Sequence, residues 1–163
     1  MQNDAYNEAI LLYDALLDDV GVFCRELATD PSQRCRRSYV RAVFAMIEGV
    51  TFCIKQMALD ENGSPKALSP AEQAMILEEG YGLDESGNVI VKNATLPTLA
   101  NLRFAFGVFA KRNGSNYKLD VSGEGWQSLR RSLAVRHRLM HPKSSKDITV
   151  SKEEIEDAGC ALR

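Results

Sequence analysis

Three residues near the C-terminal end of the chain, Arg136, His137 and His141, have types and spacings that could do chemistry. A histidine can accept and return a proton near neutral pH, so it can serve as a general base or a general acid. An arginine guanidinium is planar and permanently charged, and it binds anionic groups through two parallel hydrogen bonds. A cation and an imidazole this close in sequence can therefore hold an anion and move a proton beside it.

A predicted helix from Glu124 to about Met140 must position these residues. Ser122 is placed to cap its start, and Pro142 should end it at about His141, because the residue before a proline avoids the helical conformation. Arg136 falls within an apolar stripe. The members of this stripe, at spacings of three and four, are Trp126, Leu129, Leu133, Arg136 and Met140. Burying an unpaired guanidinium is costly, so we expect Arg136 to pair with an acid or to face a cavity.

Glu48 is the acid that this expectation singles out. It interrupts the apolar stripe of an earlier predicted helix, between Ile47 and Gly49. Glu48 either lies on an exposed flank of that helix or pairs with Arg136 and orients it. Gly49 either allows another helix to approach closely or has no special role.

The rest of the chain predicts a helical bundle. Asp30 and Pro31 are suited to start the second helix, capping boxes begin at Ser69 and Ser151, and glycines at positions 80 and 82 should end the third helix. The remaining predicted helices cover Asn3–Ala28, Pro31–Leu59, Ser69–Glu79, Leu96–Lys111 and Ser151–Leu162, with a loop over Asp60–Pro65 and a small hairpin over Leu83–Lys92. The expected fold is one all-α domain over 1–163, with about five or six helices and a β-hairpin insertion.

Composition narrows the classes of function. The net charge is −2, which argues against general binding of polyanions. Basic residues nevertheless gather in two stretches, one from Arg34 to Arg41 and one from Arg130 to Lys146, and either can form a local positive patch or a solvated helix face. The longest apolar stretch, Ala42–Ile54, is too short to span a bilayer. We therefore expect a cytoplasmic protein with no membrane association.

The run Arg136-His137-Arg138-Leu139-Met140-His141 resembles the Arg-x4-6-His motif of HEPN domains. A polar residue directly follows the arginine, and the motif closes a late helix after long N-terminal helices, as in that family. Similar runs of the type Arg-polar-x-Leu-x-His-Pro, followed by a Ser-capped acidic helix, occur in bacterial members. The resemblance at the level of the fold covers most of the chain, while the specific match covers these six residues.

The resemblance implies a helical bundle that usually forms a homodimer, and a metal-independent endoribonuclease of the toxin or phage-defence type. His141 would be the general base on a ribose 2′-hydroxyl, and Arg136 would stabilise the charge on the adjacent phosphate. His137 would orient these groups or contact the phosphate. The products would be a 2′,3′-cyclic phosphate and a 5′-hydroxyl. RNA is the implied substrate, an antitoxin or another protein is a possible partner, and no cofactor is expected.

Arg131, Arg138 and Lys143 are the predicted substrate-binding cations around this motif. Two alternatives remain open. The chain can be a noncatalytic HEPN-like module that binds a protein or a nucleic acid. His137 and His141 can also be metal ligands, because they lie four residues apart on one helical face, although no glutamate follows His137 and a full ligand set would need distant residues.

Overall fold

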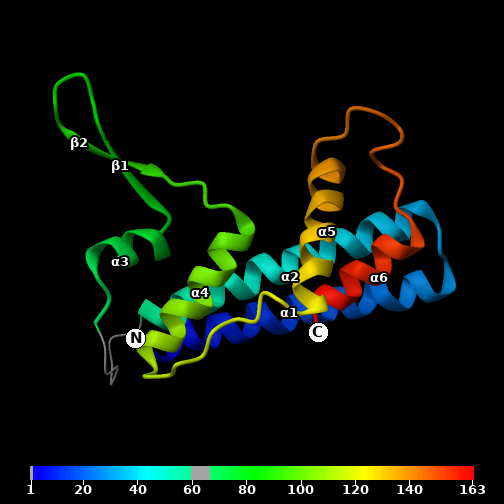
Figure 1. Ribbon diagram of the computed structural model, residues 1–163, viewed down its shortest axis with the longest axis horizontal. Helices are drawn as coiled ribbons and strands as arrows, with labels where there is room; N and C mark the ends of the chain where they lie inside the picture. Colours follow the sequence, from blue (N-terminus) through cyan, green and yellow to red (C-terminus); the bar gives the residue numbers. More distant parts are fainter. Residues whose placement is uncertain (1, 60–66) are drawn as a thin grey trace. The chain divides into compact units, whose positions relative to one another are not determined.

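The computed structural model describes residues 2–59 and 67–163, with side chains from Tyr6 onward. Within these ranges the chain forms six helices and one two-stranded hairpin, which confirms the predicted all-α class with a β-hairpin insertion (Figure 1). In chain order the elements are α1 (Gln2–Thr29), α2 (Gln33–Leu59), α3 (Pro70–Ile76), β1 (Glu79–Leu83), β2 (Val89–Asn93), α4 (Thr98–Arg112), α5 (Glu124–Met140) and α6 (Lys152–Ala161). The predicted loop over 60–65 lies outside the described residues.

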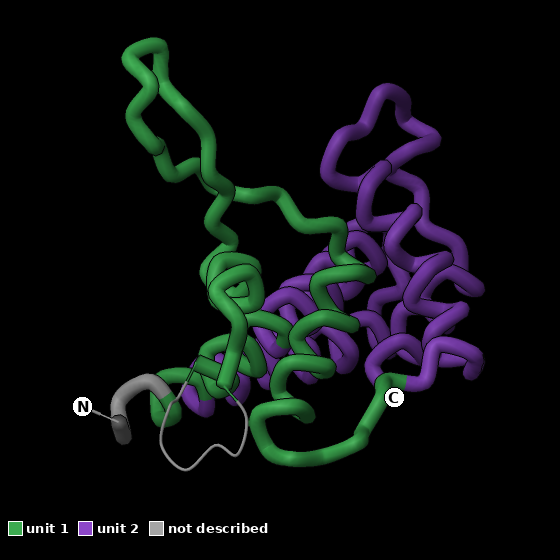
Figure 2. The backbone as a smooth tube through the Cα atoms, turned by 60° about the vertical axis from the view of Figure 1, so that its left-hand side comes forward, with its two compact units in different colours: residues 1–9, 51–119 green, residues 10–50, 120–163 purple. Residues whose placement is uncertain are grey.

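The chain divides into two compact units, coloured separately in Figure 2. Unit 1 consists of residues 1–9 and 51–119, and unit 2 consists of residues 10–50 and 120–163. The boundaries fall within α1 and α2, so both long helices contribute residues to both units. The expectation of one domain over 1–163 stays a prediction.

Local signals placed most helix ends correctly. Ser69 and Ser151 each form a complete capping box, with Glu72 and Glu154 respectively. The predicted start of α2 was wrong by two residues. The Ser32 hydroxyl accepts from the Cys35 amide, while the Asp30 carboxylate accepts from the Ser32 amide and hydroxyl. Ser32 therefore caps α2, and Asp30 supports the cap.

The hairpin in unit 1 begins earlier than predicted. Gly80 and Gly82 lie inside β1 and do not end α3, which already ends at Ile76. β1 and β2 pair antiparallel, with Tyr81 opposite Val91 and Leu83 opposite Val89. Cross-strand partners share one face of a hairpin, so this face carries four apolar side chains. All four are more than 60% exposed.

The core of unit 1 forms where α2, α3 and α4 supply Ala58, Ile76 and Val108. An ion pair adds to the contact between α3 and α4, because Lys111 Nζ lies 2.7 Å from Glu72 Oε2. The hydrogen bonds from Lys111, which has the larger effect, and from the Ser69 amide together lower the pKa of Glu72 from its usual 4.5 to about 2. The Glu72 carboxylate thus caps α3 and joins it to α4.

This pair predicts an acid-sensitive contribution to stability. Glu72 has a lower pKa in the folded chain than in the unfolded chain, so the unfolded chain binds the proton more tightly. The contribution is present above about pH 4.5 and is lost as the pH falls toward 2. Urea unfolding measured between these pH values should show that the free energy of unfolding decreases more steeply with falling pH for the wild type than for Glu72→Gln. Equal slopes for the two proteins would contradict the assignment.

A buried cation in unit 1 was missed in the sequence. The Lys55 side chain is only 1% exposed, and its Nζ donates to Glu78 Oε1 at 2.6 Å and to Asn101 Oδ1 at 3.3 Å. Glu78 has a φ of 55°, in the left-handed region that non-glycine residues avoid. Glu78 therefore has an unfavourable backbone conformation while its carboxylate neutralises a buried lysine.

Unit 2 contains the middle of α2 and the C-terminal helices. Val40, Val43, Phe44 and Ile47 of α2 are buried. A Cβ atom added at Gly49 would overlap Leu16 of α1, so Gly49 allows α1 and α2 to approach closely. In the same unit α5 packs against α6.

Among the described residues, α2 alone is long and apolar enough to cross a membrane by length and composition. The stretch Ala42–Ile54 is only part of this helix, so the shortness of that stretch does not exclude a helix long enough to span a bilayer. Half of the residues in its apolar segment are buried within the protein. The cytoplasmic location stays a prediction.

Candidate functional site

The end of α5 is set by local sequence. α5 ends at Met140, and His141 is its C-cap, with a φ of −131° and its amide donating to the His137 carbonyl at 3.1 Å. Pro142 follows, which confirms the predicted end of the helix. The predicted cap at the start was wrong, since Gly123 is the N-cap and the Ser122 hydroxyl donates instead to Asp120.

The buried face of α5 differs from the predicted stripe. Its buried residues are Ser128, Leu129, Ser132, Val135 and Leu139. Met140 is 49% exposed, and the Arg136 side chain is 26% exposed. Arg136 therefore lies at the edge of the packed face of α5, where its charged end reaches an acid and an open pocket.

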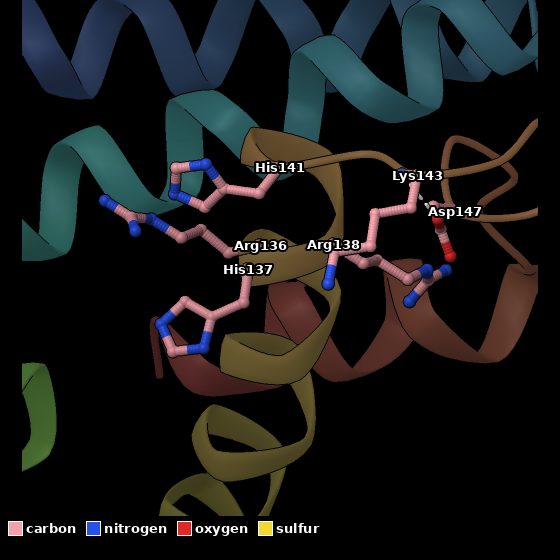
Figure 3. Close-up of a pocket in the computed structure, with 6 residues that line it drawn as sticks. All are labelled: Arg136, His137, Arg138, His141, Lys143 and Asp147. Carbon is pink, nitrogen blue, oxygen red and sulfur yellow. Dashed lines mark hydrogen bonds between the residues drawn. The ribbon is translucent and has the colours of Figure 1, made fainter.

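An open pocket of about 580 Å³ surrounds the end of α5. It is lined by Arg136, His137, Arg138, His141, Lys143 and Asp147. Figure 3 shows the side chains of Arg136, His137 and His141 projecting to one side of the helix end, whereas Arg138 extends to the other side. The pocket thus brings together every predicted catalytic residue.

Glu48 of α2 contacts the arginine of this pocket. Its Oε1 accepts a hydrogen bond from Arg136 Nη2 at 2.8 Å, and the Glu48 side chain is 45% exposed. The predicted pair is present, and Glu48 also lies on an exposed flank, so both alternatives describe it in part. The contact leaves the other guanidinium nitrogens of Arg136 available to an anion in the pocket.

Two of the predicted substrate-binding cations face α6. Successive helical residues are rotated by about 100°, so Arg131 and Arg138, seven residues apart, share a face. Arg138 donates to both carboxylate oxygens of Glu154, at 2.9 and 2.7 Å. Arg131 donates in the same way to Asp157, at 2.9 and 2.7 Å. Arg131 does not line the pocket, and both guanidinium groups hold α6 against α5.

The segment after Pro142 is held in place by hydrogen bonds. Asp147 accepts from the amides of Lys143 and Ser144, both at 2.8 Å. Arg37 of α2 donates to the Ile148 carbonyl at 3.2 Å. Arg36 and Gln33 of α2 bond to the backbone of Val150. Arg36 and Arg37 of the first basic stretch therefore anchor this segment.

Asp147 is a pocket residue that the sequence did not reveal. Its pKa is lowered mainly by the Lys143 amide, so its carboxylate is charged near neutral pH. It positions the backbone of Lys143, whose ammonium group completes the cationic lining (Figure 3). The only signal in the sequence was an acidic residue five positions after a proline, and this pattern is too common to identify Asp147 as a pocket residue.

The metal hypothesis has a specific geometric requirement. His137 and His141 share the pocket, as a two-histidine metal site needs. Across residues 6–59 and 67–163, no group of three or more His, Cys, Asp or Glu side chains is arranged to hold a metal ion. A metal at this site would need ligands from elsewhere.

Comparison with known proteins adds no family assignment. No protein-family model matches the chain, and no curated protein or solved structure matches it. The HEPN resemblance therefore depends on the six residues at the end of α5.

The arrangement suits an anionic substrate that undergoes proton transfer. Arg136 and Lys143 supply positive charge, and the two exposed imidazoles can each hold or release a proton. Glu48 orients Arg136, and the side chains of both histidines are exposed to solvent. A phosphodiester has the required charge, and the pocket is open to solvent.

Proposed function

We propose that this protein is a metal-independent endoribonuclease that cleaves RNA by attack of a ribose 2′-hydroxyl on the adjacent phosphorus. The observation that carries the proposal is that Arg136, His137 and His141 line one open pocket and project to the same side of α5 (Figure 3). RNA supplies its own nucleophile, so the protein needs only a base, a cation and correct positioning.

In this reaction His141 takes the proton from the 2′-hydroxyl, and Arg136 stabilises the negative charge that grows on the phosphate oxygens. The bond between phosphorus and the 5′-oxygen breaks. The products are a 2′,3′-cyclic phosphate and a 5′-hydroxyl. Among the described residues that line the pocket, Lys143 is the cation best placed to bind the neighbouring backbone, because Arg138 is paired with Glu154.

Product chemistry tests the proposal directly. Purified protein is incubated with single-stranded RNA in EDTA, and the fragments should accept phosphate at their 5′ ends without prior phosphatase treatment. An otherwise identical strand with one 2′-deoxyribose at the cleaved position should stay intact there. RNA that remains whole would contradict the proposal, and cleavage that EDTA abolishes would favour the metal site.

Glu48→Gln tests the orienting contact. Partly exposed ion pairs contribute up to about 1 kcal/mol, so we expect kcat/KM to fall by about threefold to fivefold, with a small change in stability. Glu124→Gln is a matched control, because it weakens an exposed pair with Arg131 on the same helix but away from the pocket. An unchanged rate for Glu48→Gln would show that the contact is only structural.

The second candidate function is a noncatalytic binding module. It is favoured by the hairpin face of Tyr81, Leu83, Val89 and Val91, which is apolar and exposed. Exposed apolar patches of this kind often mark protein interfaces. This candidate gains support if the RNA stays intact while a protein partner protects the hairpin from proteolysis. The nuclease proposal includes a homodimer, an antitoxin partner and a role in toxicity or phage defence. These parts of the proposal depend on the nuclease activity.

A further inference from the structure

His137 and His141 form a pair within the pocket. They lie four residues apart in sequence, both are exposed, and both project to the side occupied by Arg136 (Figure 3). Within residues 6–59 and 67–163 neither imidazole has a hydrogen-bond partner, in contrast to Arg136 and Arg138. Both rings are therefore available to a substrate.

Cleavage of RNA by its own 2′-hydroxyl requires two proton transfers. One proton leaves the attacking oxygen, and another must reach the departing 5′-oxygen, since an alkoxide is a poor leaving group. The first transfer is assigned to His141 in the proposed function. The second needs an acid on the opposite side of the phosphorus, because attack and departure are in line.

We infer that His137 is the general acid of this site, and this inference rests on the proposed function. His137 enters the reaction as the imidazolium. As the bond between the 2′-oxygen and phosphorus forms, His141 takes the 2′-hydroxyl proton, and the bond between phosphorus and the 5′-oxygen breaks. His137 gives its proton to that oxygen, so the 5′-hydroxyl leaves neutral, and the total of protons and charge is conserved.

The positions of the two histidines suit a base and an acid, because His137 lies in the last turn of α5 and His141 is the C-cap that follows it. Side chains four apart on a helix have Cβ atoms about 5–6 Å apart. In two-metal nucleases, the two ions that contact the attacking and the leaving oxygen are about 3.5–4 Å apart. Two imidazole rings that extend from positions one turn apart can reach two oxygens at a similar separation. Arg136 lies on the same side of the helix, so its guanidinium can contact the phosphate while the rings address the two oxygens.

A change of leaving group separates the acid from the other roles. In an RNA whose 5′-bridging oxygen at the cleaved position is replaced by sulfur, the departing thiolate needs no proton. His137→Ala should lower the rate of cleavage of the oxygen substrate by about a hundredfold or more, as loss of a general acid does. The same variant should cleave the sulfur substrate at a rate within about threefold of the wild-type rate. His141→Ala should be slow on both substrates.

Matched measurements keep the outcomes distinct. Lys143→Ala, which removes a cation from the same pocket, should change both rates by the same factor. If sulfur does not rescue His137→Ala, His137 acts by binding or orientation, and the inference is overturned. Rescue of His141→Ala instead would reverse the two assignments. If the wild type cleaves neither substrate, the proposed function itself fails.

Discussion

Replacing His141 with alanine is expected to lower the rate of RNA cleavage by about a thousandfold, because general bases typically contribute a hundredfold to ten-thousandfold. Arg136→Ala should cost about a hundredfold, in the range found when one donor to a developing anion is removed. Arg136→Lys should recover little of this loss, since an ammonium group cannot make the two-point contact of a guanidinium. Single-turnover cleavage of a labelled RNA measures all three rates.

The fold should survive these changes. His141 is exposed, and the Arg136 pair with Glu48 is partly exposed, so each variant should unfold within about 1 kcal/mol of the wild type. Arg130→Ala is the matched control, because Arg130 is an exposed cation of α5 that does not line the pocket.

In cells, expression of the wild type should slow growth, and His141→Ala should relieve the effect. Full activity of the His141 variant would disprove its role as the base.

Glu78→Ala is expected to be the most destabilising change considered, by about 3 kcal/mol, because it leaves the buried Lys55 ammonium with Asn101 as its main partner. Lys55→Met should cost much less, since Glu78 is half exposed and can return to water. Denaturant unfolding followed by circular dichroism measures both free energies.

A glycine at position 78 gives a sharper comparison. Glu78→Gly also removes the carboxylate, but glycine adopts the observed φ of 55° without strain. We expect Glu78→Gly to be more stable than Glu78→Ala by about 1 kcal/mol. If Glu78→Ala matches the wild type, the buried lysine does not depend on this acid.

Local signals in the sequence predicted several helix boundaries correctly. Pro142 ended α5 at the correct residue, and Ser69 and Ser151 formed the expected capping boxes. These signals act through the backbone within one turn, so they do not depend on the rest of the fold. The pair between Glu48 and Arg136 was one of the two alternatives raised for Glu48, because each residue interrupts an apolar stripe.

The failures involve contacts between distant segments. The rotation of α5 was misjudged because Ser128 and Ser132 count as polar in a pattern, yet they are 1% and 0% exposed. Arg131 appeared free because its partner Asp157 lies on another helix. Lys55 appeared to end an apolar stretch, although Glu78 and Asn101 enclose it. Long-range partners such as these cannot be inferred from spacing within a single element.

The three catalytic candidates all belong to six consecutive residues at one helix end. Their mutual placement depends on one helical turn and one proline, and α5 is fastened to α6 by the ion pairs of Arg131 and Arg138. A single substitution at residue 136, 137 or 141 should therefore remove the proposed activity while the scaffold stays unchanged. Among relatives with this architecture, active and inactive forms should be equally well folded, and the identity of residues 136, 137 and 141 should tell them apart.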